Sequence, residues 1–209
     1  MNESIELSSD ALKEIPTMTS EEVQLSDETI FSFIPTVIST EFSDIEDTDT
    51  TFLAIHILKT LGVIQGYPDG SFKPLSPVTR AEFLKMVMES LYSEIPTDEI
   101  ECNFTDIKGD EWFAGYVCNA KKLQITTGYP DGTFKPEQSV SLVEALAFIA
   151  RTNEWTVEKN DDEQWFMPYY TQAKDRLLLR NPEKAFDELM TREDIADLLV
   201  RIIMESDGS

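Results

Sequence analysis

Positive charge is scarce in this sequence, which has 17 Lys and Arg against 40 Asp and Glu and a net charge of −23. Nucleic acid is a poor partner for such a chain, because each phosphate contact needs a Lys or Arg to displace counterions. An anionic membrane surface is disfavoured for the same reason. Long apolar runs are also missing: no stretch reaches about 18 residues, so we expect nothing to span a bilayer.

The first residues, MNESIELSSDALKEIP, lack the basic head and apolar run of a signal peptide. Two alternatives follow. Either the protein is cytoplasmic, or its signal is absent from this chain.

Residues suited to catalysis are few. The single histidine, His56, aligns with Cys118 in the repeat described below, which favours a core or boundary role over that of a base. No nucleophile motif, phosphate loop or zinc signature is present. Acidic residues are abundant, but no pair stands out, and an all-helical domain is not a usual glycosidase scaffold. We therefore expect that the chain is not an enzyme and that it binds no cofactor and no metal.

Only two cysteines occur, Cys102 and Cys118, which fit neither a metal site nor a disulfide framework. The favoured interpretation is two small buried thiols. One bridge between them, in an oxidising compartment, is the alternative.

The strongest positive signal is internal repetition. GYPDGSFKP at 66–74 returns as GYPDGTFKP at 128–136, and the same offset of 62 residues places FSDI (42–45) on FTDI (104–107). A third copy is faint, with Trp165 lying 53 residues after Trp112, and its loop has lost the GYPDG sequence.

Each copy has the pattern helix, loop, helix. TRAE (79–82), SLVE (141–144) and TRED (191–194) each place Thr or Ser three residues before an acid, which is the capping-box signature of a helix start. Neither helix of a copy can bury its apolar stripe alone, but three packed hairpins can. The sequence therefore predicts one all-α domain over 42–206, with repeats at 42–92, 104–152 and 163–206. Residues 1–41 are predicted to be an acidic linker or strap.

Most residues of the repeated loop are expected to have a structural role. Gly66 follows the first helix, where a left-handed residue ends a helix at low cost. The next four residues, 67–70, suit a β-turn. A calcium site at the repeated acids Asp69 and Asp131 is the alternative, but the alternating ligands and distal Glu of an EF-hand loop are missing.

The run GVIQGYPDGSFKPLSPVTRAEFLKMV (62–87) resembles the S-layer homology family of bacterial surface proteins. The resemblance implies a three-pronged, pseudo-threefold spindle with a central bundle of one helix per repeat. It also implies a location at the cell surface, cell wall or S-layer, and non-covalent anchoring to the wall. The implied partners are a secondary wall polysaccharide, often bearing pyruvate ketals, and a fused or bound surface protein. The rival interpretation is a structural or protein-interaction module that has lost glycan binding.

An acidic protein needs a local site to bind an anionic glycan. An Arg in the first turn of a helix adds its fork of donors to the free backbone N–H groups and to the helix dipole. Arg80 and Arg192 hold this position, whereas the second copy has Leu142 and has by this logic lost its carboxylate clamp. A neutral sugar site and a dead site are both open there.

Trp112 and Trp165 have two equal interpretations, as faces for sugar stacking or as core wedges. Lys73 and Lys135 could steer an anion, although a solvated lysine covering apolar surface is the favoured reading. Glu82 and Glu144 are expected to act chiefly as caps that also orient an arginine. The full set of candidate ligand-binding residues is Arg80, Arg192, Trp112, Trp165, Lys73, Lys135, Asp69, Asp131, Glu82 and Glu144.

Overall fold

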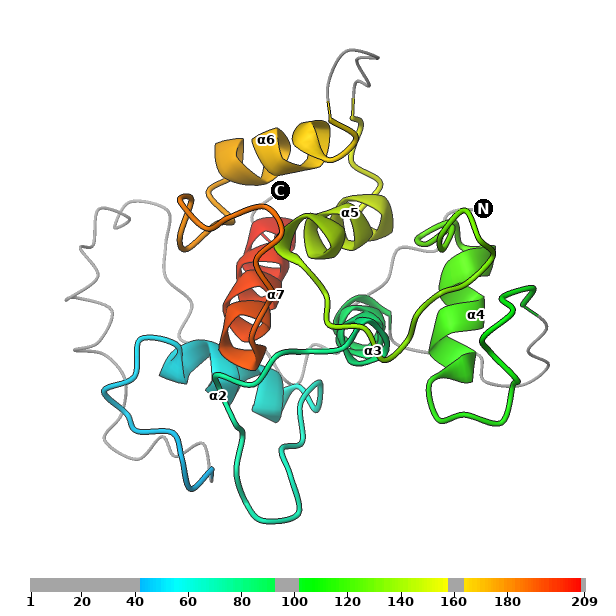
Figure 1. Ribbon diagram of the computed structural model, residues 1–209. Helices are drawn as coiled ribbons and strands as arrows, with labels where there is room; N and C mark the ends of the chain where they lie inside the picture. Colours follow the sequence, from blue (N-terminus) through cyan, green and yellow to red (C-terminus); the bar gives the residue numbers. More distant parts are fainter. Residues whose placement is uncertain (1–41, 93–101, 158–163, 208–209) are drawn as a thin grey trace.

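The computed structural model describes residues 42–92, 102–157 and 164–207 (Figure 1), so the predicted linker or strap at 1–41 lies outside the described part. Within these ranges the regular secondary structure is α-helical, and the segments between the helices form turns and three isolated β-bridges. The all-α prediction is therefore confirmed. The helices are α2 (Phe52–Thr60), α3 (Arg80–Leu91), α4 (Ala114–Lys122), α5 (Leu142–Thr152), α6 (Met167–Asp175) and α7 (Arg192–Asp207).

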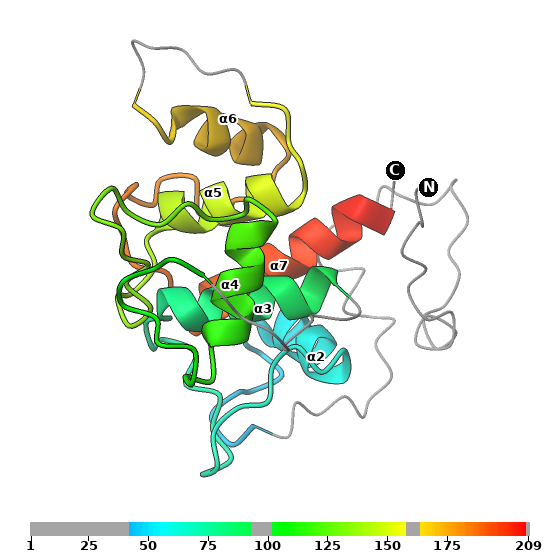
Figure 2. The same cartoon turned by 90° about the vertical axis from the view of Figure 1, so that its right-hand side faces the viewer.

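Each repeat contributes one outer and one inner helix. The inner helices α3, α5 and α7 lie at the centre of Figure 1, and α2, α4 and α6 lie around them. Every outer helix packs on the inner helix of another repeat: α4 on α3, α6 on α5 and α2 on α7 (Figure 2). The repeats therefore interlock in a ring, and no hairpin closes its own apolar face.

A ring of three backbone hydrogen bonds marks the pseudo-threefold axis. The amide of Val78 donates to Met190 O (3.0 Å), that of Met190 to Val140 O (2.9 Å), and that of Val140 to Val78 O (2.9 Å). All three side chains are buried. Equivalent residues of the three repeats thus meet in one place, directly before the inner helices begin.

The predicted helix starts are confirmed. Glu82 Oε2 accepts from Thr79 N at 2.9 Å, and Glu144 Oε2 accepts from Ser141 N at 3.1 Å, each within a complete capping box. Asp194 makes the same contacts with Thr191 in the third repeat.

The repeated loop folds onto the segment that opens its own repeat. Asp44 accepts from the amides of Phe72 (2.7 Å) and Lys73 (2.8 Å), which lie 28 and 29 residues further on. Gly66 has φ +72°, and a Cβ there would lie 2.3 Å from the Phe42 ring. The close approach of this ring to the backbone therefore requires glycine, for which the left-handed region is also free of strain. Phe72 is fully buried beneath the loop, and such burial contributes about 1.5–3 kcal/mol.

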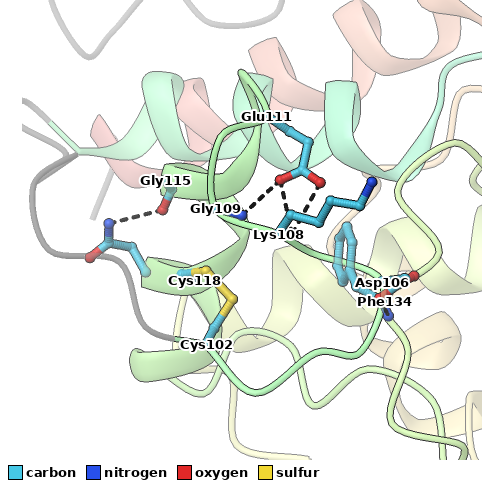
Figure 3. Close-up of a disulfide and its surroundings, with 9 residues drawn as sticks. Cys102, Asp106, Lys108, Gly109, Glu111, Gly115, Cys118 and Phe134 are labelled. Atoms are coloured by element: carbon cyan, nitrogen blue, oxygen red, sulfur yellow. Dashed lines mark hydrogen bonds between the residues drawn. A yellow bond between two sulfur atoms is a disulfide. The ribbon is translucent and has the colours of Figure 1, made fainter.

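The second repeat makes the same contacts, with Asp106 accepting from the amides of Phe134 at 2.8 Å and Lys135 at 2.7 Å. Figure 3 shows Asp106 beside Phe134. The FSDI and FTDI segments carried this signal in the sequence, since each acid is repeated at the same distance from its loop. Its function as a loop anchor was not predicted.

Cys102 and Cys118 form a disulfide, with a Cα–Cα distance of 5.0 Å (Figure 3). The favoured interpretation of two buried thiols was therefore wrong. The bridge joins the segment that enters the second repeat to α4, whose residue Cys118 is buried. Within the ranges that the structure describes, no helix is both long and apolar enough to cross a membrane.

Candidate functional site

The start of each inner helix docks on the loop of another repeat, and we call these three contacts seams. In the first seam α3 meets the loop of the second repeat, with Arg80 N donating to Gln138 O at 2.8 Å. In the second seam α5 meets the loop of the third repeat, with Leu142 N donating to Glu188 O at 3.0 Å. In the third seam α7 meets the loop of the first repeat, with Arg192 N donating to Ser76 O at 3.0 Å. The seams bring most of the predicted site residues together.

Arg80 is buried in the first seam. Its Nε donates to Phe134 O at 3.0 Å, and its Nη1 forms an ion pair with Glu144 at 2.9 Å. The guanidinium also lies over the rings of Tyr129, Phe134 and Phe148, at 4.8 to 5.2 Å from their centroids. With 5% of its side chain exposed, Arg80 links two repeats and offers little surface to a ligand.

Arg192 has the same position in the third seam and different surroundings. Its Nε donates to Phe72 O at 2.7 Å, and its guanidinium lies over Tyr67 and Phe72, at 5.0 and 4.6 Å. It is half-buried, and no acidic side chain in the described ranges forms an ion pair with it. Its Nη donors therefore have no carboxylate among those residues.

The second seam has Leu142 in place of the arginine, and Leu142 is buried. Beside it lies a pocket of about 240 Å³ whose lining includes Lys184, Met190, Asp194 and Leu198. Lys184 Nζ lies 2.7 Å from Asp194 and 3.2 Å from Glu188. A cation is thus present in this seam, but it comes from the loop rather than from the helix.

The ion pair in the second seam shifts the pKa of both partners toward the charged form. Burial raises the pKa of Asp194, but the hydrogen bonds from Lys184 and Thr191 outweigh burial and hold that pKa below its usual value. Burial lowers the pKa of Lys184, but the bond to Asp194 outweighs it and raises that pKa above 10.5. Both groups are charged at neutral pH.

Lys73 and Lys135 have matching geometry on their loops. Both adopt φ +58°, a region that L-residues rarely enter, and each Nζ lies 3.9 Å from a tyrosine centroid, of Tyr67 and Tyr129 respectively. Lys73 therefore shares its ring with Arg192, and Lys135 shares its ring with Arg80.

Asp69 and Asp131 close the turns of their loops. Asp69 Oδ1 accepts from Ser71 N and Oγ at 3.0 and 2.6 Å, and Asp131 does the same with Thr133. These hydrogen bonds lower the pKa of both carboxyls. The described residues contain no group of three or more His, Cys, Asp or Glu that could hold a metal. The loop acids thus have a structural role, and contact with a ligand remains a prediction for them.

Glu82 and Glu144 are confirmed as caps. Glu144 has two further partners, Arg80 and the hydroxyl of Tyr129, which donates at 2.6 Å.

Trp112 and Trp165 begin the second and third outer-helix segments, and each has 56% of its surface exposed. Each packs edge-on against the next residue, Phe113 or Phe166. They are therefore not core wedges, and an aromatic face at each site is open to solvent. The first repeat has Thr50 at the aligned position, and the Arg180 guanidinium donates to its hydroxyl.

Comparison with known proteins identifies the repeats. The family model of the S-layer homology domain matches residues 41–84 and 103–146. The chain is 35% identical over 122 residues to "Cell surface glycoprotein 1" of Acetivibrio thermocellus, a match that covers 54% of this chain. It is 32% identical over 119 residues, or 56% of this chain, to that organism's "Cellulosome-anchoring protein", and 30% identical over 117 residues, also 56%, to its "Exoglucanase XynX".

These matches cover 5%, 26% and 10% of the three relatives, so the chain spans only a small part of their length. The third hairpin lies outside the matched segments but shares with them the capping contacts, the seam and the ring of backbone bonds. Because the family model matches segments 41–84 and 103–146, these two segments are repeats of the S-layer homology family.

Proposed function

We propose that this chain is a binding module which anchors a surface protein non-covalently to the bacterial cell wall, by holding a wall polysaccharide that carries acidic groups such as pyruvate ketals. Similarity to proteins named as a surface glycoprotein and as a cellulosome anchor supports a location at the cell surface. The exoglucanase matches over only 10% of its length. A segment common to such different proteins favours binding over catalysis as its function.

The observation that carries the proposal is the placement of Arg192. Its guanidinium stands at the start of α7, where the helix dipole favours an anion, and it faces a tyrosine from another repeat. A carboxylate that accepts from an arginine fork makes short, charge-assisted hydrogen bonds. A seam between repeats can thus hold an acidic sugar although the chain as a whole is strongly negative.

Trp112 and Trp165 are proposed as sugar-stacking surfaces, because exposed rings offer flat apolar faces to a pyranose. The matched variants are Trp112→Ala and Trp165→Ala. Each is expected to weaken wall binding while leaving the thermal midpoint nearly unchanged.

Co-sedimentation with purified sacculi tests the proposal. The protein is expected to pellet with untreated sacculi and to stay in solution with sacculi from which the polysaccharide has been stripped. Added soluble polysaccharide should compete. Pelleting that survives stripping would contradict the proposal and would indicate peptidoglycan or protein as the partner.

A second candidate function is a protein-interaction module. The second seam favours it, because Leu142 replaces the arginine there and lies beside a pocket that both apolar and charged side chains line. No pelleting with any sacculi, together with a saturable complex with a surface protein, would favour this candidate.

A further inference from the structure

Each of the three seams contains a cation, and the charges and rings around that cation differ from seam to seam. Each seam has a helix-start position (Arg80, Leu142 or Arg192) and a loop position two residues before the carbonyl that accepts from the second helical residue. The helical amides of Ala81, Val143 and Glu193 donate to the carbonyls of Pro136, Phe186 and Pro74. The loop positions are therefore Phe134, Lys184 and Phe72.

In the first seam the arginine is neutralised inside the protein. Glu144 holds one Nη, Phe134 O holds Nε, and three rings cover the guanidinium. A ligand carboxylate would have to displace Glu144 from a site where both partners are largely buried.

In the second seam the cation and the apolar residue have exchanged places. The helix start is apolar (Leu142), and the loop position, apolar in the other two seams, is Lys184. Lys184 is 12% exposed and has carboxylates of Asp194 and Glu188 at 2.7 and 3.2 Å. This cation is also paired with acids of the protein, which here come from its own repeat.

In the third seam two cations share one aromatic ring. Lys73 Nζ lies 3.9 Å and Arg192 Cζ 5.0 Å from the centroid of Tyr67. The acid paired with Lys73 is Asp69, at 3.5 Å and well exposed, and Arg192 has no acidic partner within the described ranges. The two cations around Tyr67 therefore share a single ion-paired acid, Asp69, within the described ranges. Glu193, also in this seam, accepts from Thr51 instead.

We propose that the acidic group of the wall polysaccharide is recognised at the third seam alone, by Arg192 and Lys73 on either side of Tyr67. Arg80 and Lys184 hold the other two seams together and do not contact the acid. One chain then binds one acidic group, although it has three similar seams. This inference rests on the proposed function.

The experiment compares matched variants in co-sedimentation with sacculi, using untreated walls and walls whose carboxylates have been amidated. Arg192→Gln and Lys73→Gln test the third seam. Arg80→Gln, Lys135→Gln and Lys184→Gln are their counterparts in the other seams. Circular dichroism at the assay temperature checks that each variant is folded. Lys135→Gln serves where Arg80→Gln does not fold, since Lys135 lies on the loop surface with a weak ion pair at 3.9 Å.

On untreated walls, we expect Arg192→Gln to raise the apparent Kd at least about tenfold, because the variant loses a hydrogen bond between charged groups. Lys73→Gln should raise it less, and the three counterparts should stay within about twofold of the parent protein. On amidated walls, the affinity of the parent protein should fall to that of Arg192→Gln on untreated walls. The affinity of Arg192→Gln itself should be the same on both kinds of wall.

Three results would overturn the inference while the proposed function stands. They are an unchanged Kd for Arg192→Gln, a loss for Lys135→Gln equal to that for Lys73→Gln, and a parent protein that binds amidated walls as tightly as untreated ones. If the parent protein instead fails to pellet with either kind of wall, the proposed function itself is overturned.

Discussion

Arg80 of the first repeat and Glu144 of the second form an ion pair of 2.9 Å across the first seam, with 5% and 17% of their side chains exposed. Because Glu144 also caps α5, the pair connects the starts of two inner helices. Removal of one partner of a buried pair leaves an uncompensated charge, which is far more costly than removal of both.

Arg80→Ala is therefore expected to lower the free energy of unfolding by about 3–5 kcal/mol. The double variant Arg80→Ala/Glu144→Ala should lose less than the sum of the two single variants. Urea denaturation of the four proteins measures this coupling. Arg192→Ala is the matched control, and we expect it to lose about 1–2 kcal/mol, because the Arg192 side chain has one described hydrogen bond and no acidic partner in the described ranges. Equal losses for the two arginines would contradict this account.

Short-range patterns account for what could be predicted from the sequence. The capping boxes, the loop and the helix–loop–helix order all depend on residues close together in the chain, and all were confirmed. The packing of the three hairpins together was predicted, but the individual contacts between residues far apart in the chain were not, and the disulfide was only the alternative interpretation of the two cysteines. The packing of α4 on α3, the Asp44 and Asp106 loop anchors and the Cys102–Cys118 bridge join residues 16 or more positions apart. Local periodicity carries no information on such pairings.

The Lys184–Asp194 pair predicts an acid-dependent loss of stability. Burial raises the pKa of Asp194 in the folded protein, but the hydrogen bonds from Lys184 and Thr191 outweigh burial, so that this pKa is lowered from its usual value. The carboxylate therefore contributes stability that is fully present when the pH is above its pKa in the unfolded chain. This stability is lost as the pH falls through its pKa in the folded protein. Asp194→Asn should be less stable than the parent at pH 7, and this difference should shrink below about pH 4. Thermal midpoints across pH 2–7 test this, with the exposed Asp110→Asn as control. A difference that grows as the pH falls would contradict it.

The disulfide is expected to contribute substantially to stability. Its cysteines are 16 residues apart, and closing a loop of about 15 residues contributes roughly 3 kcal/mol in the chain-entropy model. Cys102→Ala/Cys118→Ala should unfold at a correspondingly lower urea concentration. Added reductant should destabilise the parent protein and leave the double variant unchanged. A parent protein with two titratable thiols under oxidising conditions would show that the bridge does not form.

The three outer helices end alike, at Gly62, Gln124 and Leu177, with φ of +76°, +61° and +58°. Only glycine adopts this region without strain, and other L-residues pay roughly 1–2 kcal/mol. Leu177 is 78% exposed, so its side chain adds little packing. Leu177→Gly is expected to raise the free energy of unfolding by up to about 1 kcal/mol. Gly62→Ala, where a Cβ meets no atom within 4 Å, should lower it by a similar amount. A destabilised Leu177→Gly would show that the leucine packs on part of the chain.

The exchange in the second seam can be reversed by design. Lys184→Phe alone leaves Asp194 without its closest cation, and Leu142→Arg alone brings a second cation next to Lys184, so each single variant should be destabilised. Together they reproduce the first seam, with an arginine at the helix start, a phenylalanine on the loop and an acid in the capping box. We therefore expect the double variant to be more stable than the sum of the single effects by about 0.5–3 kcal/mol, the range for residues in contact. Urea denaturation of the four proteins gives this coupling energy. A value near zero would mean that the two positions do not meet across the seam. Wall binding at the third seam should be the same in all four proteins, because Arg192 and Lys73 are untouched.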